Sequence, residues 1–143
     1  MSAKKQTPLL YQLPKVETRT NDKHLQLLRI HCDENHTKID LGYTATSYFI
    51  SGGWINIGAD TFIELKETGE KLLMTKAENI PIAPEQLHFE STKEWRYFSL
   101  YFPAVPEGKC TINLIEATNA TENDFNFYGI QLNPEKAEKS RKT

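Results

Sequence analysis

The densest group of reactive side chains in this sequence is the run His31-Cys32-Asp33-Glu34-Asn35-His36. Imidazole, thiol and carboxylate groups of this kind bind zinc and other transition metals. In a strand, however, neighbouring side chains point to opposite faces, so His31 and Cys32 would diverge. No Cys-x-x-Cys or His-x-x-x-His pair elsewhere completes a zinc site. We expect a core-facing Cys32 followed by a solvated polar turn. The alternative is a metal-dependent hydrolase that uses His31, Glu34 and His36.

Other signatures of catalysis or nucleotide binding are missing from the sequence. Ser51 precedes Gly52 and Gly53 but does not form a Gly-x-Ser-x-Gly elbow. The same glycines lack the Lys-Ser/Thr of a phosphate loop and the spacing of a dinucleotide site. No local motif pairs Cys32 or Cys110 with a histidine. We therefore predict a non-enzymatic protein with no catalytic residue, no metal and no cofactor.

The second candidate functional feature is a group of aromatic side chains. Alternation along residues 94–102 separates two sets of side chains: Phe98, Leu100 and Phe102 on one face, and Trp95, Tyr97, Ser99 and Tyr101 on the other. The first set is typical of a core face, and the second would be a flat aromatic stripe if its side is open to solvent.

Exposed apolar patches of this size usually mark interaction sites. We therefore predict a surface that binds a partner protein or a glycan through Trp95, Tyr97 and Tyr101, with Trp54 as a further member. Two alternatives remain open. A loop covers the stripe and the domain is purely structural, or Trp54 plugs one end of the core.

Length and composition limit the classes of protein to consider. The chain has 143 residues, of which 38% are hydrophobic and 25% charged, as in a small protein with one core. A formal net charge of −2 supplies no electrostatic argument for a nucleic-acid partner. No apolar run reaches the roughly 18 residues of a membrane helix, so we expect no transmembrane segment. Lys4 and Lys5 are typical of the start of a signal peptide, but no apolar segment follows them. The oligomeric state is left open.

Short extended segments, rather than helices, must position these residues. Apolar residues recur with a period near two, which predicts strands over residues 13–19, 24–32, 37–43, 54–57, 61–66, 71–75, 94–102, 110–116 and 125–132. The short glycine-containing loop between residues 66 and 71 predicts a hairpin. Pro81 and Pro84 make residues 77–86 an extended connection, and Gly129 interrupts its strand as a bulge would.

Eight or nine short strands with regularly spaced turns predict an all-β fold, an antiparallel β-sandwich. We expect a flexible N-terminal segment over residues 1–12, the sandwich over 13–132 and a disordered charged tail over 133–143. Cys32, Trp54 and Cys110 follow the Cys-Trp-Cys order of immunoglobulin domains. Their positions at strand ends would place the thiols at opposite ends of such a sandwich, so we expect two separate buried thiols rather than a disulfide.

Seven short motifs together resemble a known class of domain. They are Gly53-Trp54-Ile55-Asn56-Ile57, Asp60-Thr61-Phe62-Ile63, Thr68-Gly69-Glu70-Lys71, Ala77-Glu78-Asn79-Ile80-Pro81, Phe98-Ser99-Leu100-Tyr101-Phe102-Pro103, Ile112-Asn113-Leu114-Ile115-Glu116 and Phe125-Asn126-Phe127-Tyr128-Gly129-Ile130. Through them, residues 15–132 resemble the uncharacterised immunoglobulin-like β-sandwich domains of exported proteins from gut bacteria. The resemblance implies an immunoglobulin-like sandwich and a periplasmic or cell-surface location. Because these domains have no established catalytic residues, the resemblance assigns none to this chain.

Overall fold

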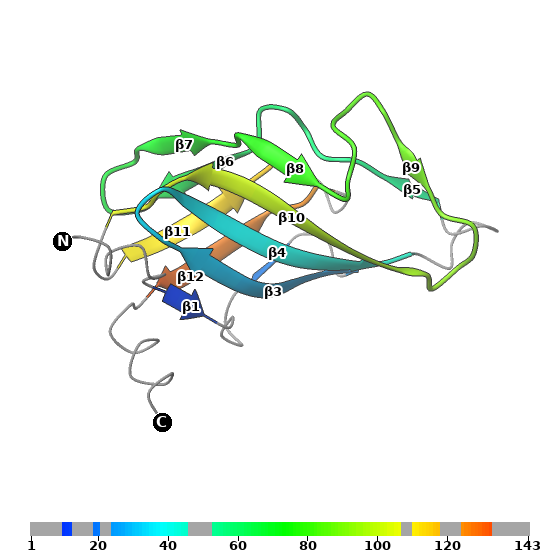
Figure 1. The fold of residues 1–143 in the computed structure, drawn as a ribbon, viewed down its shortest axis with the longest axis horizontal. Coiled ribbons are helices and arrows are strands. Elements are labelled where there is room, and N and C mark those ends of the chain that lie inside the picture. The colour runs from blue at the N-terminus through cyan, green and yellow to red at the C-terminus, as the bar shows by residue number, and fades with distance from the viewer. Residues whose placement is uncertain are drawn as a thin grey trace.

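The alternating segments of the sequence form twelve β-strands in the computed structural model, which describes residues 10–12, 19–20, 24–45, 53–106, 110–117 and 124–132. They are β1 (Leu10–Gln12), β2 (Arg19–Thr20), β3 (Leu25–Cys32), β4 (His36–Thr44), β5 (Trp54–Ile55), β6 (Phe62–Leu65), β7 (Lys71–Leu73), β8 (Lys76–Glu78), β9 (Leu87–His88), β10 (Trp95–Pro103), β11 (Cys110–Ile115) and β12 (Phe127–Leu132). These described ranges contain no helix (Figure 1), and hence none with the length and hydropathy of a membrane span.

Ten of the strands form two five-stranded sheets. The first sheet has the order β1-β3-β4-β10-β8 and the second has the order β2-β12-β11-β6-β7, while β5 and β9 pair separately. Every pairing between these named strands is antiparallel, which confirms the predicted all-β, antiparallel class. The prediction of eight or nine strands is too low. Strands of two or three residues, such as β8 and β9, are too short to produce a visible alternation.

The two sheets lie one in front of the other (Figure 1), and the buried apolar side chains of both form one core. The predicted core face of β10 is confirmed, because Phe98, Leu100 and Phe102 are all fully buried. The ring of Phe125, which precedes β12, lies 6.0 Å from that of Phe98 and 5.6 Å from that of Tyr43. The inner strands of each sheet supply most of the other fully buried side chains, including Ile39, Leu41, Ile63, Ile112 and Leu114.

The predicted hairpin over β6 and β7 is confirmed, but the segment that follows it differs from the prediction. We expected residues 77–86 to be a connection without ladder bonds, whereas Lys76–Glu78 forms β8 and pairs with Ser99 to Tyr101 of β10. The two prolines come after this strand, so they do not remove any of its ladder bonds.

The predicted N-terminal segment, the first predicted strand and the C-terminal tail lie partly or wholly outside the described residues. Leu10–Gln12, expected to be flexible, forms β1 and pairs with β3. Arg19–Thr20, at the end of the predicted first strand, forms β2 and pairs with β12. Residues 13–18 and 133–143 are not described, so the start of that strand and the charged tail stay predictions.

The predicted bulge at Gly129 is confirmed. Ile112 pairs with Ile130 and Leu114 with Phe127, so Tyr128 and Gly129 together lie opposite the single residue Asn113. Gly129 has a φ of 72°, which is unfavourable for residues with a Cβ. Its N–H donates to Oδ1 of Asn113 at 2.9 Å, replacing the ladder bond that the bulge removes.

A second bulge, in β3, decides which side chains face outward. The register shifts between Leu27 and Arg29, so Leu28 has no partner on β4. Leu25 and Leu27 are buried before the bulge, and Ile30 and Cys32 are buried after it. The shift therefore keeps apolar residues in the core and places Arg29 directly opposite Asp40.

Replacement of Gly129 by alanine should destabilise the fold through the backbone alone. A Cβ at this position would meet no atom within 4 Å, so the cost comes from the left-handed conformation. We expect a loss of about 1–2 kcal/mol in the free energy of unfolding, measured by urea denaturation.

Gly58→Ala is the matched control, because its Cβ would lie in ordinary contact, 3.6 Å from Cγ of Glu116, and its φ is not in the left-handed region. This variant should be neutral or slightly more stable. Equal losses in both variants would contradict the role assigned to the Gly129 backbone.

Candidate functional site

The predicted aromatic stripe lies on the side of the first sheet that faces away from the core. Along β10, Trp95, Tyr97, Ser99 and Tyr101 alternate with the buried core residues. They pair with Thr44, Gly42, Asp40 and Lys38 of β4, and directly paired residues share a face of the sheet. We use the name outer face for the outward residues of β3, β4, β8 and β10: Gln26, Arg29, His31, His36, Lys38, Asp40, Gly42, Thr44, Lys76, Glu78, Trp95, Tyr97, Ser99, Tyr101 and Pro103.

The indole of Trp95 lies directly against the backbone of β4 at Gly42. A Cβ on Gly42 would be only 2.6 Å from Cζ2 of Trp95, so the ring occupies the space that any other side chain would fill. Glycine usually weakens a strand, but here it permits this close approach. Trp95 is nevertheless 52% exposed, so no loop among the described residues covers it.

Tyr97 extends this surface along the same strand. Its ring centroid lies 6.3 Å from that of Trp95, with 29° between the two ring planes. The two rings form a surface that we call the Trp95–Tyr97 platform. It is the part of the predicted contact surface that the structure brings together.

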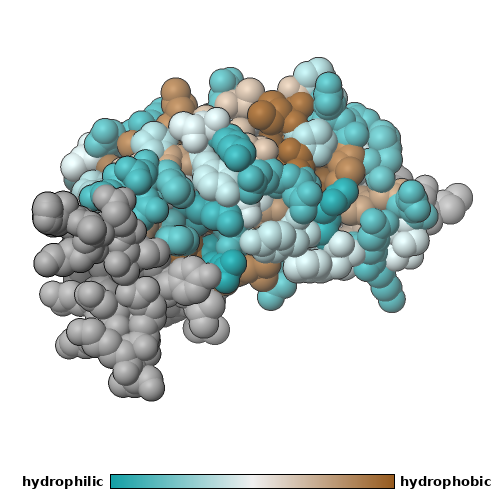
Figure 2. Space-filling model, in the orientation of Figure 1, coloured by the Kyte–Doolittle hydropathy of each residue, from teal (hydrophilic) through white to brown (hydrophobic). Residues whose placement is uncertain are grey.

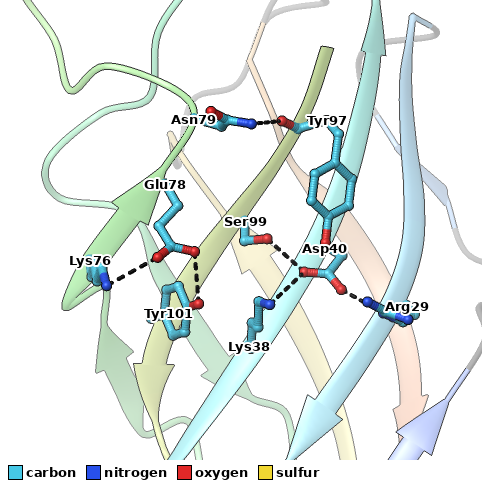
Figure 3. Close-up of polar contacts among 9 residues, drawn as sticks. All are labelled: Arg29, Lys38, Asp40, Lys76, Glu78, Asn79, Tyr97, Ser99 and Tyr101. Atoms are coloured by element: carbon cyan, nitrogen blue, oxygen red, sulfur yellow. Dashed lines mark hydrogen bonds and ion pairs between the residues drawn. The ribbon is translucent and has the colours of Figure 1, made fainter. Parts of the chain in front are cut away.

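A buried carboxylate, Asp40, lies beside the platform. Its side chain is 1% exposed although it is on the outer face. Oδ1 accepts a hydrogen bond of 2.7 Å from Oγ of Ser99, and Oδ2 accepts one of 2.6 Å from Nε of Arg29 (Figure 3). Lys38 Nζ lies 3.8 Å from Oδ1. These partners offset the cost of burying a charge.

The same contacts determine the ionisation of Asp40. Burial raises the pKa of its carboxyl, but the hydrogen bonds from Ser99 and Arg29 and the charge of Lys38 outweigh it and hold the pKa below the ordinary 3.8. Asp40 is therefore ionised near neutral pH. The Tyr97 hydroxyl lies beside this carboxylate (Figure 3), so the charge is next to the platform.

Tyr101 lies in a more polar environment than the other aromatic residues of the outer face. The ammonium groups of Lys38 and Lys76 lie 5.8 and 5.2 Å from its ring centroid. Its hydroxyl donates to Oε1 of Glu78 at 2.8 Å, and Lys76 Nζ lies 3.1 Å from Oε2 of the same carboxylate (Figure 3). The ring of His36 is 5.6 Å away. Tyr101 is therefore half-buried among charged groups rather than part of the platform.

Trp54 does not join the other predicted binding residues. It lies on β5 and pairs with His88 of β9, in the separate two-stranded sheet. Its side chain is 48% exposed while the neighbouring Ile55 is buried, so the alternative that Trp54 plugs the core is wrong.

The polar run after β3 forms a local turn. Oδ1 of Asp33 accepts hydrogen bonds from the backbone N–H of Asn35 at 2.8 Å and of His36 at 2.9 Å. Cys32 is buried, so the predicted core-facing cysteine followed by a polar turn is confirmed. The rings of His31 and His36 are 6.5 Å apart. Within the described ranges, no three His, Cys, Asp or Glu side chains are grouped to hold a metal ion.

Both cysteines are free thiols. Burial raises the pKa of Cys32 to about 12, and burial also raises that of Cys110, which is half-buried rather than buried as we expected. The expectation of opposite ends is also at odds with the structure, since Cys110 is close enough to contribute to the pKa of Cys32. A thiol that stays protonated near neutral pH is a poor nucleophile.

Cys32 should not react with a thiol reagent in the folded protein. In a Cys110→Ser variant at pH 8, we expect no reaction with Ellman's reagent until guanidinium unfolds the chain, because the thiolate of Cys32 is scarce and inaccessible. The wild type under the same conditions reports the half-buried Cys110. Rapid labelling of the folded variant would contradict the burial of Cys32.

Asp40→Asn should destabilise the protein in a pH-dependent way. The variant keeps the side-chain shape but removes the charge paired with Arg29 and Lys38, which should cost about 1–3 kcal/mol at pH 7 in urea unfolding. Since folding lowers the pKa of Asp40, its contribution is present above pH 3.8 and is lost as the pH falls through the lower folded value.

The difference in stability between wild type and variant should therefore shrink below about pH 4. Asp60→Asn, at an exposed turn position, is the control and should change the free energy of unfolding by less than about 0.5 kcal/mol. A wild-type advantage that stays constant with pH would mean that Asp40 is not ionised in the folded state.

Comparison of the chain with protein-family models, with curated proteins and with solved structures finds no significant match in any of the three. The chemistry of the outer face must therefore be interpreted from its own geometry.

Proposed function

We propose that this protein is a non-enzymatic binding module that takes a saccharide on the outer face of its first sheet. One observation carries the proposal: an exposed tryptophan packs against a glycine of the neighbouring strand, with Tyr97 beside it. The C–H face of a sugar ring packs well against flat aromatic rings of this kind. The polar groups around Asp40 supply donors and acceptors for the hydroxyl groups of the ligand.

The composition of the outer face favours a saccharide over a partner protein. Trp54, Leu73, Ile82 and Trp95 are the large hydrophobic side chains most exposed in the described residues, and only Trp95 lies on this face. Figure 2 shows mostly hydrophilic and intermediate side chains over β4 and β10. The centre of a protein interface is usually more apolar and depleted of charge. A ligand that needs both stacking and hydrogen bonding fits this surface better.

We further infer an immunoglobulin-like sandwich, and the strand order supports it. If β3 is labelled A, the first sheet has the order A-B-E-D from β3 to β8. The second sheet then has the order G-F-C from β12 to β6, and β7 extends it as C′. These orders are those of immunoglobulin domains. The Cys-Trp-Cys hallmark does not take part, because Cys32 lies in strand A and Trp54 precedes strand C.

No observation favours the metal-dependent hydrolase built on His31, Glu34 and His36 over the binding module. If the domain is purely structural, the wild type will bind no ligand in the experiment that follows. The periplasmic or cell-surface location implied by the resemblance would give a saccharide-binding module access to extracellular glycans.

Trp95→Ala should abolish saccharide binding and leave the fold nearly intact. Glycan-array screening of the wild type identifies a ligand, and calorimetric titration then measures its Kd. Loss of the exposed indole removes a central contact, so the Kd should rise at least about tenfold, equivalent to about 1.4 kcal/mol. The melting temperature should fall by only a few degrees, since half of the side chain is already in solvent.

Two further variants make this test specific. Gly42→Ala leaves Trp95 in place but pushes its indole off the strand, because the new Cβ would otherwise lie 2.6 Å from Cζ2, so binding should weaken. Trp54→Ala removes an equally exposed tryptophan from the separate β5–β9 sheet and should leave the Kd unchanged. A wild type that binds nothing on the array, or a Trp95→Ala variant that binds normally, would overturn the proposal.

A further inference from the structure

Two lysines and a tyrosine form a row across the outer face, two strand positions from Ser99 and Asp40. Tyr101 of β10 pairs with Lys76 of β8 on one side and with Lys38 of β4 on the other. We call these three residues the basic row. His31 of β3 continues the row beyond Lys38.

Contacts within the face hold both ammonium groups of the basic row in place. They lie 5.2 Å (Lys76) and 5.8 Å (Lys38) from the Tyr101 ring centroid, within the range of cation–π attraction. Burial alone lowers the pKa of Lys38, but the Asp40 carboxylate together with Tyr101 and Tyr97 outweighs it and raises the pKa above its usual value. Lys38 therefore carries its charge throughout the neutral range.

The charges that an approaching ligand meets on this face are mainly positive. The side chains of Arg29, Lys38 and Lys76 are 41%, 27% and 60% exposed. Of the two carboxylates on the face, Glu78 is 45% exposed but Asp40 only 1%. Three accessible cations thus accompany one accessible carboxylate, in a protein whose formal net charge is −2. This local excess would attract an anionic ligand.

The basic row and the platform lie along the same strand at a spacing that suits a chain of sugars. Tyr97 and Tyr101 are four residues apart on β10, which corresponds to about 13 Å in an extended strand. Ser99 and the buried Asp40 fill the interval. An oligosaccharide that stacks one ring on the platform would carry the substituents of a ring farther along the chain to the lysines.

We propose that the outer face selects acidic saccharides: one sugar of the chain stacks on the Trp95–Tyr97 platform, and the basic row binds a carboxylate or sulfate group on a sugar farther along the same chain. This inference rests on the proposed saccharide-binding function of the same face. Ammonium groups form charge-assisted hydrogen bonds with either anion, so the shared feature of the ligand is a negative charge on a sugar ring.

Matched polymers with and without charge test this selectivity. Polygalacturonate and its fully methyl-esterified form differ in the carboxylate, and dextran sulfate and dextran differ in the sulfate. By calorimetric titration, the wild type should bind at least one charged polymer about tenfold or more tightly than its neutral counterpart. The preference should shrink in high salt, because exposed charges are screened.

The double variant Lys38→Met, Lys76→Met should lose this preference. Methionine keeps an apolar side chain against the Tyr101 ring but removes the charge. Lys71→Met is the matched control, because Lys71 Nζ also lies over an aromatic ring, 4.9 Å from the centroid of Phe62, but in the second sheet. This control should keep the preference of the wild type.

The possible results distinguish failure of the acidic selectivity from failure of the saccharide-binding function itself. Binding that depends on Trp95 but is equal for charged and neutral polymers would overturn the acidic selectivity and leave the saccharide module standing. Binding to none of the polymers, together with a silent glycan array, would overturn both. Charge-dependent binding that survives Trp95→Ala, or that falls equally in Lys71→Met, would mark a non-specific polyelectrolyte effect and would also overturn the inference.

Discussion

The pairing of β4 with β10 is the constraint on which the rest of the molecule depends. Nine consecutive residue pairs, from Trp95–Thr44 to Pro103–His36, remain in register without a bulge. Because side chains alternate, this one ladder places Phe98, Leu100 and Phe102 in the core and aligns the outer face on the other side. A shift by a single residue would exchange the two sets, so the stability of the core also preserves the geometry of the candidate site.

The buried Asp40 connects fold and site in a second way. Burying a carboxylate costs free energy unless hydrogen bonds and opposite charges compensate for the lost water. Here the partners of Asp40 come from β3, β4 and β10. The Leu28 bulge is what brings Arg29 to Asp40. The outer face is thus an organised network, in which one buried carboxylate joins side chains from three neighbouring strands.

The sequence predicts the long elements of this fold well and its site only in part. Alternation over residues 94–102 identifies both faces of β10, and Gly129 reveals its bulge, because these signals are local. The importance of Gly42 could not be predicted, since it depends on an indole that a distant part of the chain delivers. The ion pair of Asp40 with Arg29 depends on a register shift in β3 that the amino-acid sequence does not reveal. Strand β8 escaped prediction because its three residues are followed closely by prolines.

The lengths of the outermost strands affect how copies of this protein meet one another. Both sheets end on strands of two or three residues in the described structure: β1 and β8 in the first, β2 and β7 in the second. Lys76 and Lys71 lie on two of them. Short borders that carry charge are poor templates for strand addition. Strands are the regular structure of the described residues, and such borders disfavour the stacking of copies into fibres.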